Sequence, residues 1–509
     1  MAKRKPIRTL FLLTIAVCIQ SALAAPVDND LLKLLGQLKE RLEKLEQRNS
    51  ELEGKLNAAL GRGTGADAEK RLQALEQAQE KIHRGLDAET ISQYEPELTA
   101  RLKAVEKDAL DMRKAAKKVD ALDGVSVGLG LTTVLQRPTG LPAGTADSGS
   151  QLNYRGDITV QVPLEAMGAI EHKLFAHFRL GQGLGLNKPY ANLGAFASAP
   201  DAVAFRASGA NPDDAVAILG EAWYQAKIPL PIGGFKPQSR QSLELSFGKM
   251  DFFGFFDQNA GAGDEARQFL NSVFVHNPLL DAGGQIGVDA NGFQPGLVAA
   301  YVNTTHKSET WRLSLGVFAS GPGANYQRVA SPLVIAQAES ALRLNSLPGN
   351  YRIYAWRNAQ GVELDGRQAA HTGWGLSLDQ RLSESLLAFG RWGQMVNGKV
   401  PFDRALTAGA EVNGSAWGRG ADALGLALGH LRASGDYRAA GGSGDLIGDG
   451  SGVFNFAPSG AERLFEVYYR YRISKQFELS PDFQYLWQMG GNPAAKPVKV
   501  AGLRAQLSY

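Results

Sequence analysis

The chain ends in Ala501-Gly502-Leu503-Arg504-Ala505-Gln506-Leu507-Ser508-Tyr509, and this stretch decides the fold. Every second residue from Ala501 to Tyr509 is apolar or aromatic, whereas the residues between them are glycine, arginine, glutamine and serine. A strand of an outer-membrane barrel needs this pattern, because one face meets lipid and the other meets water in the lumen. The edge strand of a soluble sheet shows the same alternation, so the rest of the chain has to separate the two interpretations.

The same period of two recurs from residue 124 onward, in residues 157–162, 173–180 and 243–248. The most informative case is residues 465–473, where apolar residues alternate with Glu466, Tyr468, Arg470 and Arg472. A dry sandwich core would have to pair these charges, because each unpaired buried charge costs several kcal/mol. A water-filled lumen solvates them, so the pattern favours a barrel.

The length of the β region sets the number of strands. Transmembrane strands of about 10 residues, with their turns and loops, use about 24 residues each, which gives roughly 16 strands over residues 124–509. A barrel of this size leaves an aqueous channel. The expected fold is therefore an all-β transmembrane barrel of about 16 antiparallel strands, preceded by an α-helical coiled-coil segment. Residues 195–210 and 439–452 are rich in glycine or alanine and are expected to form external loops.

The N-terminal part predicts three segments. Residues 1–24 have a basic start, a short apolar run and Ala22-Leu23-Ala24 before a cleavage site, which is typical of a signal peptide. A lipoprotein signal ending at Cys18 is the alternative. Residues 25–121 are expected to be a helical, coiled-coil periplasmic segment, and residues 122–509 the outer-membrane barrel.

The helical segment carries leucines at heptad spacing. The first series is Leu31, Leu35, Leu38, Leu42, Leu45, Asn49, Leu52 and Leu56. Asn49 either fixes the register of a coiled coil or lies outside a real seam. So narrow an apolar stripe needs a partner helix, and the helices either fold back on each other or bundle between subunits as a homo-oligomer.

Composition argues against several functions. The formal charge of +3 on 509 residues gives no reason to expect a nucleic-acid partner. Cys18 is the single cysteine, so the mature chain has no disulfide or thiolate site. No histidine lies in a nucleophile motif, and no metal-binding spacing is present. We therefore expect no enzyme activity, no cofactor and no metal.

Several short motifs stand in order along the β region. They are residues 221–225 (EAWYQ), 247–251 (FGKMD), 256–259 (FDQN), 268–272 (QFLNS), 417–425 (WGRGADALG), 466–470 (EVYYR), 479–485 (LSPDFQY) and 490–493 (GGNP), followed by Gly502-Leu503-Arg504. Together they resemble the carbohydrate-selective porin family of Gram-negative outer membranes. The resemblance covers roughly residues 124–509 and implies a 16-stranded barrel, loops that fold inward to narrow the pore, and diffusive uptake of small sugars. The helical N-terminal extension departs from the family's minimal barrel.

The candidate pore-lining and sugar-contacting residues fall into two sets. One set lies in a polar stretch interleaved with phenylalanines after residue 250, which forms either a constriction loop or an outer loop packed on the rim: Asp251, Asp257, Asn259, Gln268 and Asn271. The other set consists of candidate lumen charges: Arg391, Arg419, Asp422, Glu466, Arg470, Arg472 and Arg504. Arg419 and Asp422 also have the spacing to pair with each other. The near balance of signs predicts weak ion selectivity.

The expected function is passive diffusion of small carbohydrates through a bacterial outer-membrane barrel. The expected partners are the permeant sugars, outer-membrane lipid and the barrel-assembly machinery, which is expected to engage the C-terminal strand ending at Tyr509. The alternative is an envelope-tethering barrel with little or no conductance.

Overall fold

A computed structural model describes residues 76–77, 124–141, 145, 149–187, 198–205, 214–232, 239–283, 292–306, 308–321, 331–443 and 458–509. The chain divides into two units, Met1–Ala121 and Leu122–Tyr509. In the first unit only Glu76 and Gln77 are described, and both are helical and exposed. The predicted signal peptide (1–24) and the remainder of the predicted coiled-coil segment (25–121) lie outside the described residues. Among the described helices, none is both long and apolar enough to cross a membrane.

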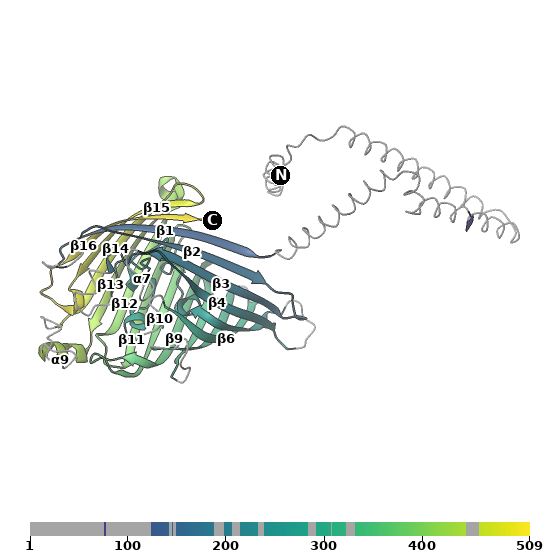
Figure 1. Cartoon of the computed structure of the whole chain (residues 1–509), viewed down its shortest axis with the longest axis horizontal. Helices are drawn as coiled ribbons and strands as arrows, with labels where there is room; N and C mark the ends of the chain where they lie inside the picture. Colours follow the sequence, from purple (N-terminus) through teal and green to yellow (C-terminus); the bar gives the residue numbers. More distant parts are fainter. Residues whose placement is uncertain are drawn as a thin grey trace, which may run out of the picture. The chain divides into compact units, whose positions relative to one another are not determined.

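The second unit is a closed barrel of 16 antiparallel strands (Figure 1). Each strand pairs with its neighbours in sequence, and the first and last strands pair to close the barrel. This confirms the predicted barrel. The strands are β1 (Ser126–Thr139), β2 (Gln151–Pro163), β3 (Glu171–Gln182), β4 (Val216–Pro229), β5 (Gln241–Asp251), β6 (Phe293–His306), β7 (Glu309–Phe318), β8 (Leu333–Leu344), β9 (Leu347–Val362), β10 (Gln368–Arg381), β11 (Leu386–Asn397), β12 (Phe402–Gly414), β13 (Arg419–Ala433), β14 (Ala461–Arg472), β15 (Phe477–Trp487) and β16 (Val498–Ser508).

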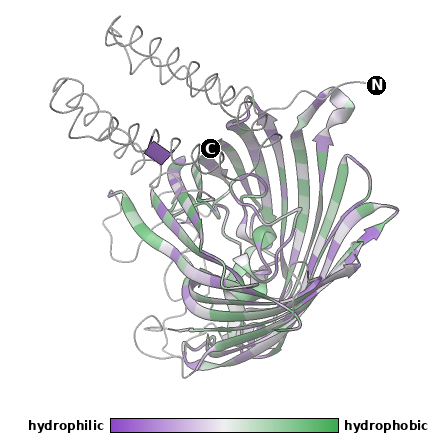
Figure 2. Cartoon of the chain, turned by 90° about the vertical axis from the view of Figure 1, so that its right-hand side faces the viewer, coloured by the Kyte–Doolittle hydropathy of each residue, from purple (hydrophilic) through white to green (hydrophobic). Residues whose placement is uncertain are grey.

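The last strand has the two faces that its sequence predicts. Leu503 and Leu507 are 40% and 48% exposed on the outside, whereas Arg504 and Gln506 are buried inside the barrel. In β1, Val134 lies opposite Arg504 and Leu135 lies opposite Leu503. The register therefore continues the same alternation across the closing seam, and polar and apolar bands alternate along the strands (Figure 2).

The two ends of the barrel differ in their connections. The strands β8 and β9 are joined by Asn345 and Ser346 alone, both with positive φ, as a two-residue hairpin of matching twist requires. This turn lies at the end that holds Tyr509, which we call the turn end. The opposite, loop end carries the long connections, including residues 183–215, 252–292 and 434–460. Outer-membrane barrels place short turns in the periplasm and long loops at the cell surface.

Candidate functional site

The connection between β5 and β6 folds into the barrel interior. It contains η1 (Phe252–Gly254), α7 (Ser272–Val275) and α8 (Pro278–Gly283). Its side chains Phe252, Phe256, Phe269 and Phe274 are all fully buried. Burying a phenylalanine of this kind contributes about 1.5–3 kcal/mol, so the aromatic residues of this segment draw it into the barrel. Of the two predicted positions for this polar and aromatic stretch, the structure adopts the inward one.

The wall of the barrel supplies an aromatic surface for this connection. Phe269 contacts Phe389 of β11 and Tyr468 of β14, with ring centroids 5.5 and 5.0 Å apart. Phe252 contacts Phe318 at the end of β7, at 5.1 Å. Aromatic side chains from several strands of the wall therefore pack against the connection.

A buried carboxylate on β14 also holds the connection. Glu466 accepts hydrogen bonds from the backbone N–H groups of Leu270 at 2.5 Å and Asn271 at 3.0 Å. The Asn271 side chain caps α7 and donates to Gln484 of β15 at 3.1 Å. These bonds fix the residues that lead into α7.

Arginines of the wall hold the residues of the connection that precede Leu270. Arg504 donates to the carbonyl groups of Glu265 at 2.9 Å and Gln268 at 2.7 Å. Arg470 donates to the carbonyl of Arg267 at 3.1 Å. Because carbonyl oxygens near a guanidinium accept strong charge-assisted bonds, these contacts position the backbone of the connection.

The connection between β3 and β4 also turns inward, so the expectation of an external loop at residues 195–210 is wrong for residues 198–205. Val203 and Phe205 are fully buried, and so is Asp201. The alanine-rich composition correctly indicates a loop, but it does not reveal that these apolar side chains have a surface inside the barrel to pack against. The second expected external loop begins in α9 (Gly435–Ser443), and its residues 444–452 lie outside the described residues.

Hydrogen bonds attach the β3–β4 connection to the wall. The Ser198 backbone N–H donates to Glu462 of β14 at 3.0 Å. The Pro200 carbonyl accepts from the side chains of Gln136 and Gln484, each at 2.8 Å. Glu462 and Glu466 lie four residues apart on the inner face of β14, so one strand holds both inward connections.

The two connections also contact each other. The Ala199 N–H donates to the Ser272 hydroxyl at 3.1 Å, and the Ser272 N–H donates to the Ala199 carbonyl at 2.9 Å. The Ala202 N–H donates to the Leu270 carbonyl at 2.7 Å. Together the two segments form a single inner layer.

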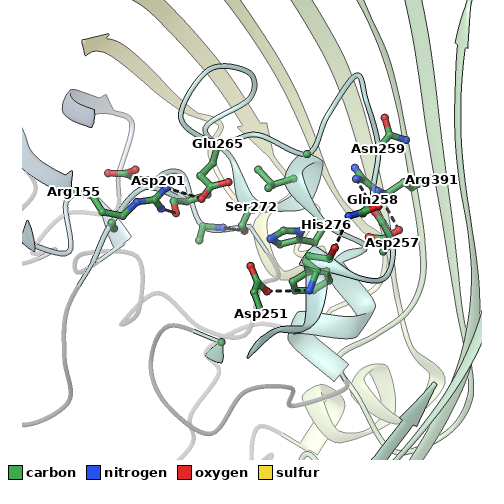
Figure 3. Close-up of a pocket in the computed structure, with 18 of the residues that line it drawn as sticks. Arg155, Asp201, Asp251, Asp257, Gln258, Asn259, Glu265, Ser272, His276 and Arg391 are labelled. Atoms are coloured by element: carbon green, nitrogen blue, oxygen red, sulfur yellow. Dashed lines mark hydrogen bonds and ion pairs between the residues drawn. The ribbon is translucent and has the colours of Figure 1, made fainter. Parts of the chain in front are cut away.

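A cavity of about 770 Å³ lies between this inner layer and the wall (Figure 3). Figure 3 shows Arg155 and Arg391 on opposite sides of the view, with residues of the β5–β6 connection between them. The wall contributes four arginines, each from a different strand: Arg155, Arg179, Arg352 and Arg391. The carboxylates of the lining are Asp201, Asp251, Asp257 and Glu265. Polar and aromatic groups that sugars use for binding complete it: Asn187, Phe253, Gln258, Asn259, Ser272 and His276.

Each of the four wall arginines has a carboxylate partner. The shortest ion pairs are Arg155–Glu265 at 2.8 Å, Arg179–Asp157 at 2.8 Å, Arg352–Asp379 at 2.9 Å and Arg391–Asp257 at 3.3 Å. The positive charges are therefore opposed at short range, which lowers the net field in the cavity while leaving strong local dipoles.

Burial and neighbouring charges shift the pKa values of the inner layer. Burial raises the pKa of Asp257, partly offset by Arg391 and by the Tyr354 hydroxyl, which donates to it at 2.8 Å. Burial raises the pKa of Asp201 to about 6 and lowers that of His276 to about 3, so His276 is neutral at pH 7. Burial would also raise the pKa of Glu265, but Arg155 and Arg179 outweigh it and lower that pKa.

The twelve residues predicted from the sequence separate into three groups. Asp251, Asp257, Asn259 and Arg391 line the cavity. Gln268, Asn271, Glu466, Arg470 and Arg504 take part in hydrogen bonds that fix the inner layer. Arg419, Asp422 and Arg472 lie together at the turn end, where Arg419 pairs with Asp422 at 2.5 Å and the Arg472 N–H donates to Asp422. Outside the first group, the structure places none of them in the cavity lining, and a role in sugar contact stays a prediction for all twelve.

The sequence did not indicate three of the arginines that line the cavity, Arg155, Arg179 and Arg352. It also did not indicate the carboxylates Asp201 and Glu265. Arg179 lies on the inward face of residues 173–180, whose alternation is visible in the sequence. The alternation therefore places Arg179 inside the barrel. Arg155 and Arg352 lie on the inner faces of β2 and β9, and period-two alternation is again the signal that places them. Glu265 and Asp201 lie in irregular segments, where no periodicity indicates direction.

The closed 16-stranded barrel, with a polar cavity narrowed by inward connections, defines a porin. A family profile described as "Carbohydrate-selective porin, OprB family" matches residues 154–509, and the chain belongs to this family. The chain is thus an outer-membrane channel protein, and the resemblance seen in its motifs is confirmed.

One solved porin structure shows the same fold, and two others are more distant matches. The high-pH structure of Pseudomonas putida OprB is 17% identical, with a TM-score of 0.59, and the match covers 78% of this chain and 97% of that chain. The low-pH structure of the same protein is 14% identical, with a TM-score of 0.41 and coverage of 78% and 96%. A mutant of Rh. blastica porin is 10% identical, with a TM-score of 0.42 and coverage of 76% and 100%. No curated protein sequence matches the chain.

Proposed function

We propose that this porin mediates passive diffusion of small carbohydrates across the outer membrane. The observation that carries the proposal is the cavity of about 770 Å³, where arginines of the barrel wall and carboxylates of the inward connections and the end of β5 face the same space. Sugar hydroxyl groups both donate and accept hydrogen bonds, so a lining that offers both kinds of partner suits them. Family membership supports the same solute class.

The aromatic part of the lining supports this solute class as well. Phe253 and His276 stack with ring centroids 3.6 Å apart and an interplanar angle of 6°. Both side chains are half-buried and line the cavity, so they offer apolar surface for the C–H groups of a sugar ring, while the exposed Gln258 offers a planar amide. A channel must bind its solute weakly enough to release it, and scattered contacts of this kind meet that requirement.

The alternative, an envelope tether with little or no conductance, has weaker support, because a barrel that only anchors has no use for an open, charged cavity. The barrel-assembly machinery remains the proposed partner of the C-terminal strand ending at Tyr509. A homo-oligomer assembled through residues 25–121 remains a proposal that rests on the heptad pattern.

Liposome swelling with a panel of sugars tests the proposal. Purified protein should admit a monosaccharide faster than a trisaccharide, and Arg155→Gln together with Arg179→Gln should change this ratio. Lys475→Gln, an exposed charge in the turn between β14 and β15, is the matched control and should leave the ratio unchanged. No swelling with any sugar and no conductance in a planar bilayer would favour the tether.

A further inference from the structure

Three arginines lie side by side on the outside of the barrel at its loop end. Arg404 is near the start of β12, Arg432 is near the end of β13 and Arg463 is near the start of β14. Arg404 is directly opposite Arg432 in the register, and Arg463 is directly opposite His430. We call Arg404, Arg432 and Arg463 the outer arginine patch.

The burial of the neighbouring residues shows that the patch faces outward. Ala405, Leu431 and Leu464, each adjacent in sequence to a patch arginine, are buried inside the barrel. Leu406 and Leu428, which share the outward faces of β12 and β13, are 46% and 56% exposed. The patch therefore continues directly into the apolar surface that meets lipid.

The patch carries more positive charge than its neighbours neutralise. Asp403 lies at an irregularity in the β12–β13 register, and it accepts from Arg432 Nε at 2.8 Å and forms an ion pair with that guanidinium. In the part of the chain that the structure describes, the guanidinium groups of Arg404 and Arg463 form no ion pair or hydrogen bond. Like charges on directly opposed residues destabilise a sheet, so a bound anion would relieve the repulsion between Arg404 and Arg432.

Aromatic residues beside the patch indicate its depth in the membrane. Trp487 of β15 lies directly opposite Arg463, and its ring is 5.4 Å from that of Tyr485. Tryptophan and tyrosine on the outside of a barrel concentrate at the membrane–water interface. The patch is thus at the height of the lipid headgroups, on the side of the cell surface.

Among the described residues, the turn end of the same strands shows no such patch. There, Arg419 of β13 is paired with Asp422 and stacks over the Tyr471 ring at 4.1 Å. If interfacial arginines served only a general role in barrels, both ends of these strands would carry similar arginine patches. The excess of unpaired charge at the loop end points to an anion that is present on that side of the membrane.

We propose that the outer arginine patch binds the phosphate groups of a phosphorylated glycolipid in the outer leaflet, with Leu406 and Leu428 contacting its acyl chains. Clusters of arginine beside an apolar membrane surface recognise anionic lipid headgroups, and the guanidinium fork matches phosphate geometry. The site lies outside the lumen, so this inference is independent of the proposed sugar transport.

Native mass spectrometry of the purified barrel with added bisphosphorylated lipid A tests the proposal. Arg404→Gln combined with Arg463→Gln should weaken lipid A binding about 30-fold, because each interfacial arginine contributes about a fivefold factor. Arg404→Lys combined with Arg463→Lys should retain most of the binding. The control, Arg381→Gln combined with Lys475→Gln, removes two exposed charges at the turn end and should bind as the unmodified protein does.

Two further ligands identify the source of the phosphate. Dephosphorylated lipid A should bind the unmodified barrel and the Arg404/Arg463 glutamine variant equally, and millimolar inorganic phosphate should not displace lipid A. Equal binding of bisphosphorylated lipid A to the glutamine variant and the unmodified protein would overturn the proposal. Complete displacement by inorganic phosphate would also overturn it, because the site would then be one for a free anion. Retained heat resistance of the folded barrel on gels ensures that each variant has folded.

Discussion

The two inward connections reach the barrel interior by different means. The β5–β6 connection buries four phenylalanines against an aromatic wall, whereas the described part of the β3–β4 connection has one, Phe205, and is held mainly by hydrogen bonds to its backbone. Apolar burial tolerates small displacements, but a hydrogen bond is lost when its geometry fails. The comparison leads us to expect that the buried aromatic residues of the β5–β6 connection contribute more to the stability of the inner layer than the β3–β4 connection does.

The largest effect should come from removing an aromatic anchor. Phe269→Ala should destabilise the inner layer by about 3–5 kcal/mol, because it leaves a cavity between Phe274, Phe389 and Tyr468. Single-channel conductance should rise and become noisier as the connection loosens. Phe205→Ala is the matched change in the other connection, and an equal or larger effect there would reverse the comparison.

The two glutamates of β14 allow the next test. Glu466→Ala leaves the N–H groups of Leu270 and Asn271 without their acceptor, at about 1–3 kcal/mol for each, less whatever entering water restores. Glu462→Ala removes the acceptor of Ser198 in the β3–β4 connection. We expect Glu466→Ala to raise the size limit for sugars in liposome swelling more than Glu462→Ala does. Identical size limits would show that the inner layer moves as one body.

Asp201 provides a pH-dependent test of the β3–β4 connection. Its pKa in the folded protein, about 6, lies above the ordinary value of 3.8, so its protonated form is favoured by folding. The stabilisation is complete below pH 3.8 and is lost as the pH rises through 6. Above pH 6 the cavity gains a negative charge, so the reversal potential in a salt gradient should shift toward cation preference between pH 5 and pH 7. Asp201→Asn should reduce that shift, and a shift of unchanged size in this variant would assign it to another group.

The smallest effect should come from the contact between the two connections. Ser272→Ala removes the hydroxyl that accepts from Ala199, at about 0.5–1.5 kcal/mol. In a double-mutant cycle with Glu462→Ala, measured by thermal unfolding, we expect a non-additive term, because both changes act on the same backbone segment. Strictly additive effects would show that the two connections contribute independently to the stability of the barrel.

The sequence predicted the barrel because the alternation along a barrel strand is a local rule. The outward Leu503 and inward Arg504 follow from period-two alternation, which needs no knowledge of the rest of the chain. The interior of the barrel follows no such rule. Glu466 meets Leu270 across 196 positions of sequence, and a partner at that distance leaves no periodic trace in either segment. For the same reason the polar stretch after residue 250 was recognised as a candidate site, but which of its residues face the cavity was not.

The seam between β1 and β16 affects how the barrel is made. The Leu129 N–H donates to the Tyr509 carbonyl at 2.9 Å, and the Tyr509 N–H donates back to the Leu129 carbonyl at 2.8 Å. Nearby, the Thr132 hydroxyl bonds to Gln506, a residue 374 positions away. Ring closure over such a distance is slow, and until it occurs both outermost strands expose unpaired backbone groups. Until β1 and β16 pair, the open barrel therefore exposes two strand edges that can pair with other chains. Removal of even the terminal tyrosine would slow closure of the barrel and leave these edges open to aggregation.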